Sequence, residues 1–120
     1  SKNKFSGSIA SFLGKVRPQS NKENVRYLEI EFYKKMAYFQ AKKKLKSILK
    51  SVEIDDFLIL HRYGKLFPGE NIILVLVASK HRKDGLLFTK KSVEWFKKEI
   101  TFWKKENFKS HSSWVKSEYE

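Results

Sequence analysis

The feature that most limits the fold is an uninterrupted apolar run over residues 72–78, composed of Ile, Leu, Val and Ala. A short apolar run rich in β-branched residues favours a deeply buried strand. It is far shorter than the roughly 20 apolar residues that a helix needs to cross a bilayer. We therefore expect a central, deeply buried strand from Asn71 to Ser79.

The flanking segments show two different periods. Residues 25–33 alternate between two faces, which is strand periodicity. Strands are also expected over residues 8–16 and 54–62, with a loop over 17–24 and a turn over 65–70. Helical spacing of apolar residues predicts helices over 34–52 and about 85–100, the second with Asp84 as its N-cap.

The order is β–β–α–β–β–α, followed by a basic tail containing Trp114. This order predicts an α+β fold with two main helices on one face of a mostly antiparallel sheet. The length of 120 residues suggests a single domain over 1–120. No charged-then-apolar leader opens the chain, so a soluble intracellular protein is expected.

The charge balance points to an anionic partner. The chain has 26 Lys and Arg against 13 Asp and Glu, a net charge of +13. Nucleic acid, an acidic protein and a phosphorylated small molecule all fit such a surface. The chain has no cysteine, which excludes disulfides, thiolate metal sites and a cysteine nucleophile.

Basic residues follow two of the predicted strands. Arg17 follows the first strand, and His81-Arg82 follows the central one. An Arg can hold a phosphate with two parallel hydrogen bonds, and His can bind an anion or transfer a proton near neutral pH. These positions suggest one cationic site, although a solvated loop is the commoner role for an isolated Arg.

Lysines recur along the second predicted helix. Lys97 and Lys104 are seven residues apart, so on a continuous helix they would share a face. Clustered lysines lower one another's pKa and can create a general base or nucleophile. Simple solvation of a basic helix is the alternative.

A second set of lysines, seven in residues 34–50 with no acid among them, indicates a solvated face or a nucleic-acid patch. No nucleic-acid-binding signature accompanies it.

His61 lies on an apolar strand and is expected to be structural, and His111 carries no signal. No His and carboxylate spacing predicts a metal site. Pro68-Gly69-Glu70 is interpreted as a turn joining two strands into a hairpin.

Taken in order, the motifs resemble the large subunit of molybdopterin synthase, the MoaE family, from about Gly7 to Val115. The carriers are Phe12-Leu13-Gly14-Lys15-Val16-Arg17, Leu28-Glu29 with Tyr33 and Met36, His61-Arg62-Tyr63-Gly64-Lys65-Leu66-Phe67-Pro68-Gly69-Glu70, Ser79-Lys80-His81-Arg82, Phe96-Lys97, Phe102-Trp103-Lys104-Lys105-Glu106 and Trp114-Val115. The resemblance implies the family's α/β hammerhead fold.

It also implies a reaction. The family's large subunit converts cyclic pyranopterin monophosphate to molybdopterin with two sulfurs from the C-terminal thiocarboxylate of a small ubiquitin-like subunit. Two large subunits form a homodimer within a heterotetramer in the cytoplasm, with no metal or other cofactor on the large subunit. By position, the resemblance implies two catalytic lysines, Lys97 and Lys104. It implies substrate contacts from Lys15, Val16, Arg17, His81, Arg82, Lys97, Lys104, Lys105 and Glu106.

The sequence departs from the family in four places. Its N-terminal segment is short, and Gly85-Leu86 replaces the usual Ala-Phe after His81-Arg82. Thr101 stands where a helix-ending Pro is common, and Glu118 stands about where a basic tail residue is usual. None of these removes a catalytic position.

Overall fold

The structure is a computed structural model that describes residues 6–20, 23–31, 34–101, 104–108 and 112–114. Its elements in chain order are β1 (Ser8–Lys15), β2 (Gln19–Ser20), β3 (Glu23–Ile30), α1 (Lys34–Leu49), β4 (Asp56–His61), β5 (Gly64–Leu66), β6 (Asn71–Ser79), α2 (Arg82–Thr101), β7 (Lys104–Phe108) and β8 (Ser112–Trp114). The molecule is elongated, with extents of 52 × 26 × 25 Å.

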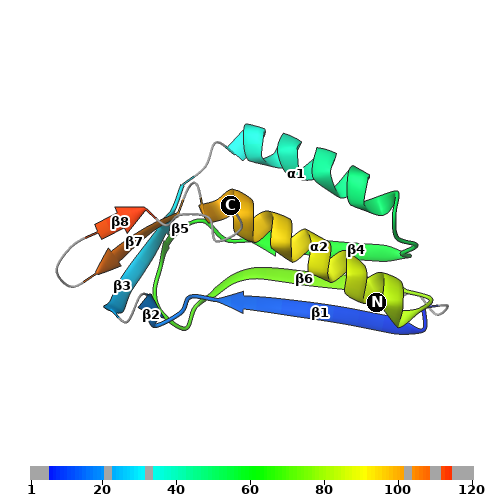
Figure 1. Ribbon diagram of the computed structural model, residues 1–120, viewed down its shortest axis with the longest axis horizontal. Helices are drawn as coiled ribbons and strands as arrows, with labels where there is room; N and C mark the ends of the chain where they lie inside the picture. The colour runs from blue at the N-terminus through cyan, green and yellow to red at the C-terminus, as the bar shows by residue number, and fades with distance from the viewer. Residues whose placement is uncertain (1–5, 21–22, 32–33, 102–103, 109–111, 115–120) are drawn as a thin grey trace.

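A three-stranded antiparallel sheet, in the order β1-β6-β4, runs along the long axis (Figure 1). The apolar run is its central strand, and Val75 in the middle of β6 is completely buried. Ser8 pairs with Ser79 and Lys15 pairs with Asn71, so β1 and β6 run in opposite directions. The strand predicted from the apolar run is therefore confirmed, and so is its central place.

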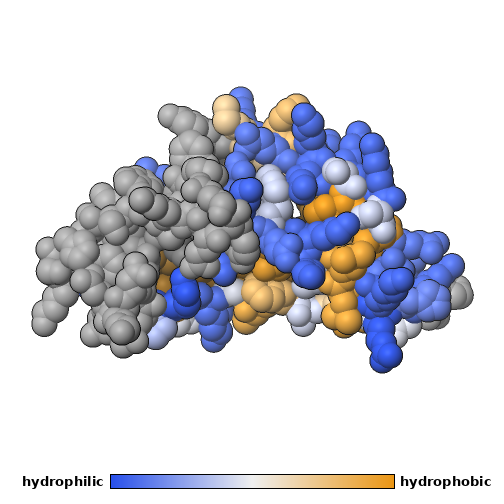
Figure 2. All heavy atoms as spheres, viewed as in Figure 1, coloured by the Kyte–Doolittle hydropathy of each residue, from blue (hydrophilic) through white to orange (hydrophobic). Residues whose placement is uncertain are grey.

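The helices lie over one face of this sheet. Figure 2 shows hydrophilic side chains along much of the two helices, on the face seen there. Beneath them is a core built from alternate residues of the strands and from single faces of the helices. Its buried members are Ala10, Ile48, Val52, Ile73, Val75, Val77 and Phe88. Burial of these side chains contributes the main stabilisation of this layer.

A second sheet lies at one end of the first (Figure 1). Its order is β2-β3-β7-β8, and β5 also pairs with β3. It has its own small core, in which Val16, Leu28, Ile30 and Leu66 are each at most 2% exposed. Val16 directly follows β1, so this core joins the two sheets where the first strand ends.

The α+β class with helices on one face is confirmed, but several local expectations are wrong. The expected loop over 17–24 and the basic tail contain the short strands β2, β7 and β8, and the first residues of the expected turn over 65–70 belong to β5. Helix α2 begins at Arg82, so Asp84 lies in its first turn and is not its N-cap. Its carboxylate instead accepts a hydrogen bond from the backbone N–H of Glu53 at 3.3 Å.

The turn at Pro68-Gly69 forms as predicted, with Gly69 at a φ of 87° and Glu70 N–H donating to Phe67 O at 3.0 Å. It does not close a hairpin, because β5 pairs with β3 and β6 pairs with β1 and β4. The turn instead carries the chain from one sheet to the other. No helix in the described part of the chain is long and apolar enough to cross a membrane.

Candidate active site

Lys15, Val16 and Arg17 lie where β1 leaves its sheet. The backbone of Val16 is held on both sides, because its N–H donates to Glu70 O at 2.9 Å and its carbonyl accepts from Gly69 N–H at 3.0 Å. Its side chain is 2% exposed, whereas Lys15 and Arg17 are exposed. A buried residue between two exposed cations is the pattern of an extended segment with one face in the core. The segment therefore presents two positive charges from a fixed backbone.

The turn that holds Val16 is itself braced. The Glu70 carboxylate accepts a hydrogen bond from Phe67 N–H at 2.6 Å and lies 3.8 Å from the Arg62 guanidinium. Arg62 also donates to Asn71 O at 3.2 Å. These contacts give the turn a supporting role beside Val16.

Lys104, Lys105 and Glu106 reach the same end of the molecule through β7. In the ladder with β3, Lys104 pairs with Ile30 and Glu106 pairs with Leu28. Both partners belong to the small core that also contains Val16. The β7 backbone therefore runs beside the strand that packs against Val16.

The expectation that Lys97 and Lys104 share one helix face is wrong. Helix α2 ends at Thr101 even without a proline there, and Lys104 is already the first residue of β7. Pairing of Lys104 with Ile30 in the second sheet replaces the helical hydrogen bonds. The two lysines thus come from different elements that meet at one end of the fold.

Lys97 is exposed about one turn before the end of α2. Its neighbour Phe96 stacks on His61, with ring centroids 6.0 Å apart and an interplanar angle of 22°. His61 pairs with Ile73, and Ile73 pairs with Gly14. This chain of contacts sets Lys97 at the level of the β1 end. We call Lys15, Val16, Arg17, Lys97 and the backbone of residues 104–106 the lysine end.

His61 has the structural role that its apolar strand predicted. Burial lowers its pKa from 6.5 to about 4, and a hydrogen bond with the backbone of Arg62 opposes part of that shift. The imidazole is therefore neutral near pH 7 and acts as an aromatic packing partner for Phe96.

His81 and Arg82 lie at the opposite end of the sheet. Both are exposed where β6 passes into α2, and the buried Ser79 hydroxyl donates to His81 O at 2.7 Å. Arg82 is separated from Lys97 by about 22 Å along the helix axis, at 1.5 Å per residue. The two ends of β6 are about 26 Å apart at 3.3 Å per residue. Within one chain, His81 and Arg82 are therefore not brought together with the lysine end.

Close packing between α2 and the end of β6 explains why a glycine fits at position 85. A Cβ at this position would lie 2.8 Å from Ser79 Oγ. Glycine therefore lets the first turn of α2 approach the end of β6 closely, which fixes the backbone that carries His81 and Arg82.

No individual role was predicted for Lys65, a basic residue on the second sheet. Lys65 Nζ lies 4.0 Å from the centroid of the Tyr27 ring and 5.7 Å from that of Phe67. The two rings are 5.9 Å apart, so the ammonium is held by cation–π attraction on the second sheet. Lys65 lies on β5, and a strand of only three residues has too short a pattern to be predicted from the sequence. Among the described residues, no group of three or more His, Asp or Glu could hold a metal ion.

The fold is that of a molybdopterin synthase. The crystal structure of molybdopterin synthase from Staphylococcus aureus superimposes with a TM-score of 0.81 at 29% identity, covering 93% of this chain and 82% of that one. The molybdopterin synthase catalytic subunit of Ralstonia nicotianae is 34% identical over 109 residues, which are 91% of this chain and 62% of the relative. That of Pyrococcus abyssi is 36% identical over 112 residues, which are 93% of this chain and 76% of the relative.

The family model described as MoaE protein matches residues 1–99. The chain belongs to the MoaE family, as its motifs predicted. This relationship favours the synthase interpretation over a nucleic-acid-binding domain. The family match ends before Lys104, whereas the relatives from Ralstonia nicotianae and Pyrococcus abyssi align over more than nine-tenths of this chain.

Proposed function

We propose that this chain is the catalytic subunit of a molybdopterin synthase and acts in the cytoplasm. It converts cyclic pyranopterin monophosphate to molybdopterin, with a small ubiquitin-like subunit as the sulfur donor. The name of its relatives, catalytic subunit, supports a complex with a second kind of chain. The absence of cysteine agrees with this chemistry, because each of the two sulfurs then comes from the thiocarboxylate of a partner chain.

The observation that carries the proposal is the lysine end. There the substrate's anionic phosphate and pterin would meet Lys15 and Arg17, which a doubly hydrogen-bonded Val16 holds in place. A cation on a fixed backbone stabilises negative charge without reorganising, which is how a charged transition state is best stabilised. Val16 sets the distance between the two cations, while Lys105 and Glu106 complete the contacts from β7.

Lys97 and Lys104 are the catalytic residues in this proposal. Once the thiocarboxylate sulfur has bonded to the precursor, each ammonium can stabilise the oxyanion that forms when water attacks the resulting thioester, which releases the partner's carboxylate and leaves the sulfur on the pterin. Each ammonium can also donate or accept a proton. Their origin on different elements, α2 and β7, lets them approach the substrate from two sides. No metal or other cofactor of this chain is needed for these steps.

His81 and Arg82 enter the site from a second copy of the chain. At about 22 Å along the helix from Lys97, they cannot contact the same small substrate within one chain. In a homodimer whose copies run in opposite directions, the His81 end of one copy would meet the lysine end of the other. The site is then formed twice, within the heterotetramer that includes two small subunits.

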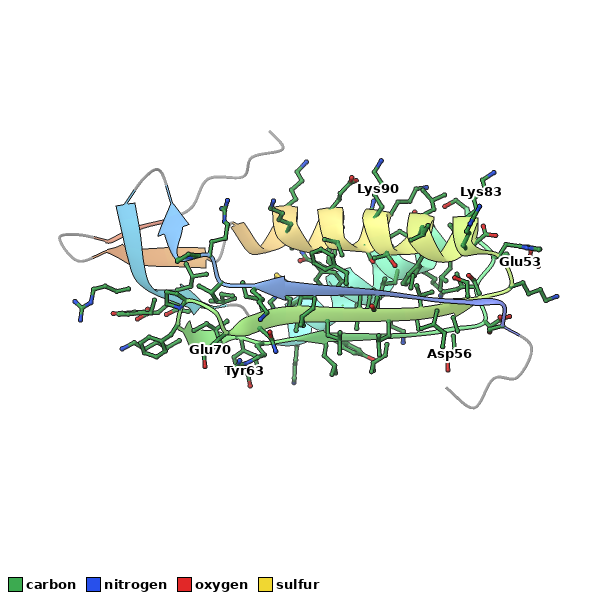
Figure 3. All side chains as sticks on the ribbon, turned by 90° about the horizontal axis from the view of Figure 1, so that it is seen from below. Glu53, Asp56, Tyr63, Glu70, Lys83 and Lys90 are labelled. Atoms are coloured by element: carbon green, nitrogen blue, oxygen red, sulfur yellow. The ribbon has the colours of Figure 1, made fainter. Side chains whose placement is uncertain are left out.

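The test is a sulfur-transfer assay with the thiocarboxylated small subunit and the precursor, measuring the dithiolene product. Lys97→Ala should lower the rate by roughly a hundredfold or more, because one charge-stabilising group is lost. Lys90→Ala is the matched control, because Lys90 lies on the same helix and points away from the sheet (Figure 3). Wild-type turnover by the Lys97 variant would refute its catalytic role.

A further inference from the structure

The side of α1 that faces away from the sheet combines lysines with exposed apolar side chains. Leu45 and Ile48 pack the other side of this helix against the core. A surface helix of this kind ordinarily presents charged and polar side chains to water. Here Phe39 is 69% exposed, and Met36, one turn before it, is 55% exposed. The outer side of α1 is therefore both basic and partly apolar.

Exposed lysines surround Phe39 on this helix. Residues three, four and seven positions apart lie on the same side of an α-helix. Lys35 lies four residues before Phe39, and Lys43 lies four residues after it. Lys42 and Lys46 follow Phe39 by three and seven residues, and all four lysines are exposed. We call this surface the α1 outer face, and its members are Lys35, Met36, Phe39, Lys42, Lys43 and Lys46.

The segment that contains this face carries more than half of the net charge. Residues 34–50 hold seven Lys and no Asp or Glu, which is +7 of the chain's +13. Helix α1 runs along one edge of the molecule (Figure 1), and its 16 residues extend about 24 Å at 1.5 Å per residue. Figure 2 shows hydrophobic atoms among hydrophilic ones along the same edge. The α1 outer face is thus a long, exposed and strongly cationic stripe, which favours an extended anionic partner.

The mixture of lysines and apolar side chains decides between two kinds of anionic partner. A nucleic-acid duplex offers phosphates to the lysines, but its bases stay stacked and leave Phe39 and Met36 in water. The surface of an anionic bilayer accepts both kinds of side chain. Its phosphates attract the ammonium groups, and the boundary between headgroups and acyl chains accepts the aromatic and thioether side chains. A bilayer surface is therefore the better complement.

We propose that the α1 outer face docks this chain on the surface of a bilayer that contains anionic lipids. Helix α1 lies in the plane of the headgroups, with Phe39 and Met36 at the acyl boundary and the lysines on the lipid phosphates. Because Leu45 and Ile48 hold the opposite side of α1 on the core, the sheet stays on the side away from the lipid. The inference goes beyond the proposed function and does not depend on it, because no residue of the proposed active site belongs to this face.

The test is co-sedimentation of the purified full chain with vesicles at about physiological salt. Wild type should sediment with vesicles of phosphatidylcholine mixed with phosphatidylglycerol and stay in solution with phosphatidylcholine alone. Lys42→Glu/Lys46→Glu should lower the partition coefficient on the order of a hundredfold or more, because two attractive charges become repulsive. Phe39→Ala should lower it by about tenfold without changing the preference for the anionic lipid, because only the apolar contact is lost.

The matched control is Arg26→Glu/Lys80→Glu, which changes the net charge equally at two exposed residues outside the helices. It should bind within about threefold of wild type, because salt screens charges beyond roughly 8 Å. All these side chains are exposed, so each variant should keep the wild-type circular dichroism spectrum.

A wild type that ignores the anionic vesicles, or a control that loses as much binding as Lys42→Glu/Lys46→Glu, would overturn the proposal. Tighter binding to a DNA duplex than to the vesicles, lost in the same lysine variant, would assign the α1 outer face to nucleic acid and also overturn it. None of these results depends on turnover, so the proposed function stands or fails separately.

Discussion

Lowering the pH from 7 to 5 should destabilise the folded chain through His61. The pKa of its imidazole is lowered by burial from 6.5 to about 4 in the folded state. Between these two values the unfolded chain binds the proton and the folded chain does not. Stability therefore falls as the pH falls through this window, and is unaffected by His61 above it.

The size of the effect follows from the two pKa values. Near pH 5 the unfolded imidazole is almost fully protonated and the folded one is not, which corresponds to a loss of at most about 2 kcal/mol. The partial exposure of His61 reduces this value. In the folded chain the imidazole stacks on the Phe96 ring.

The assay is urea unfolding at pH 7 and pH 5 for wild type and for His61→Phe, which keeps the aromatic stacking but cannot titrate. Wild type should lose more stability than the variant, and the difference between the two losses isolates His61 from the carboxylates. Equal losses in both proteins would refute the assignment of a buried, neutral histidine at this position.

Two further predictions concern Gly85, which packs under His81 and Arg82, and Glu70, which braces the turn beside Val16. Gly85→Ala should cost about 1–3 kcal/mol, because the new Cβ would lie 2.8 Å from Ser79 Oγ, and adding Ser79→Ala should recover part of the loss in thermal unfolding. Glu70→Ala should cost about 1 kcal/mol and weaken precursor binding, because Phe67 N–H and Arg62 lose their carboxylate partner. An unchanged melting temperature in either variant would contradict the packing described above.

The elements with strong local periodicity could be predicted from the sequence. The apolar run of β6 and the apolar faces of α1 and α2 carry their own signal, because burial and period coincide in each. The short strands could not be predicted in this way. Gly64–Leu66 is only three residues long, and Lys104–Phe108 is mostly polar. Both are strands because β3 offers them backbone hydrogen-bonding partners, which are distant in sequence.

The composition of the candidate site was only partly predictable. Family motifs identified the basic residues, and the family itself is confirmed by the comparisons. The sequence shows that a residue comes directly after a strand, but it does not show at which end of the molecule that strand finishes. Because β1 and β6 are antiparallel, Arg17 and Arg82 both follow strands and yet lie at opposite ends. That separation is why the proposed site takes residues from two chains.

The central claim is that each site combines the lysine end of one copy with His81 and Arg82 of another. The most direct measurement is the turnover of a mixed dimer containing one Arg82→Ala chain and one Lys97→Ala chain, isolated by two different affinity tags. One of its two sites would have both residues intact and the other would have neither. The account predicts about half of wild-type turnover, while each homodimeric variant has almost none. A mixed dimer no more active than the two homodimers would contradict it.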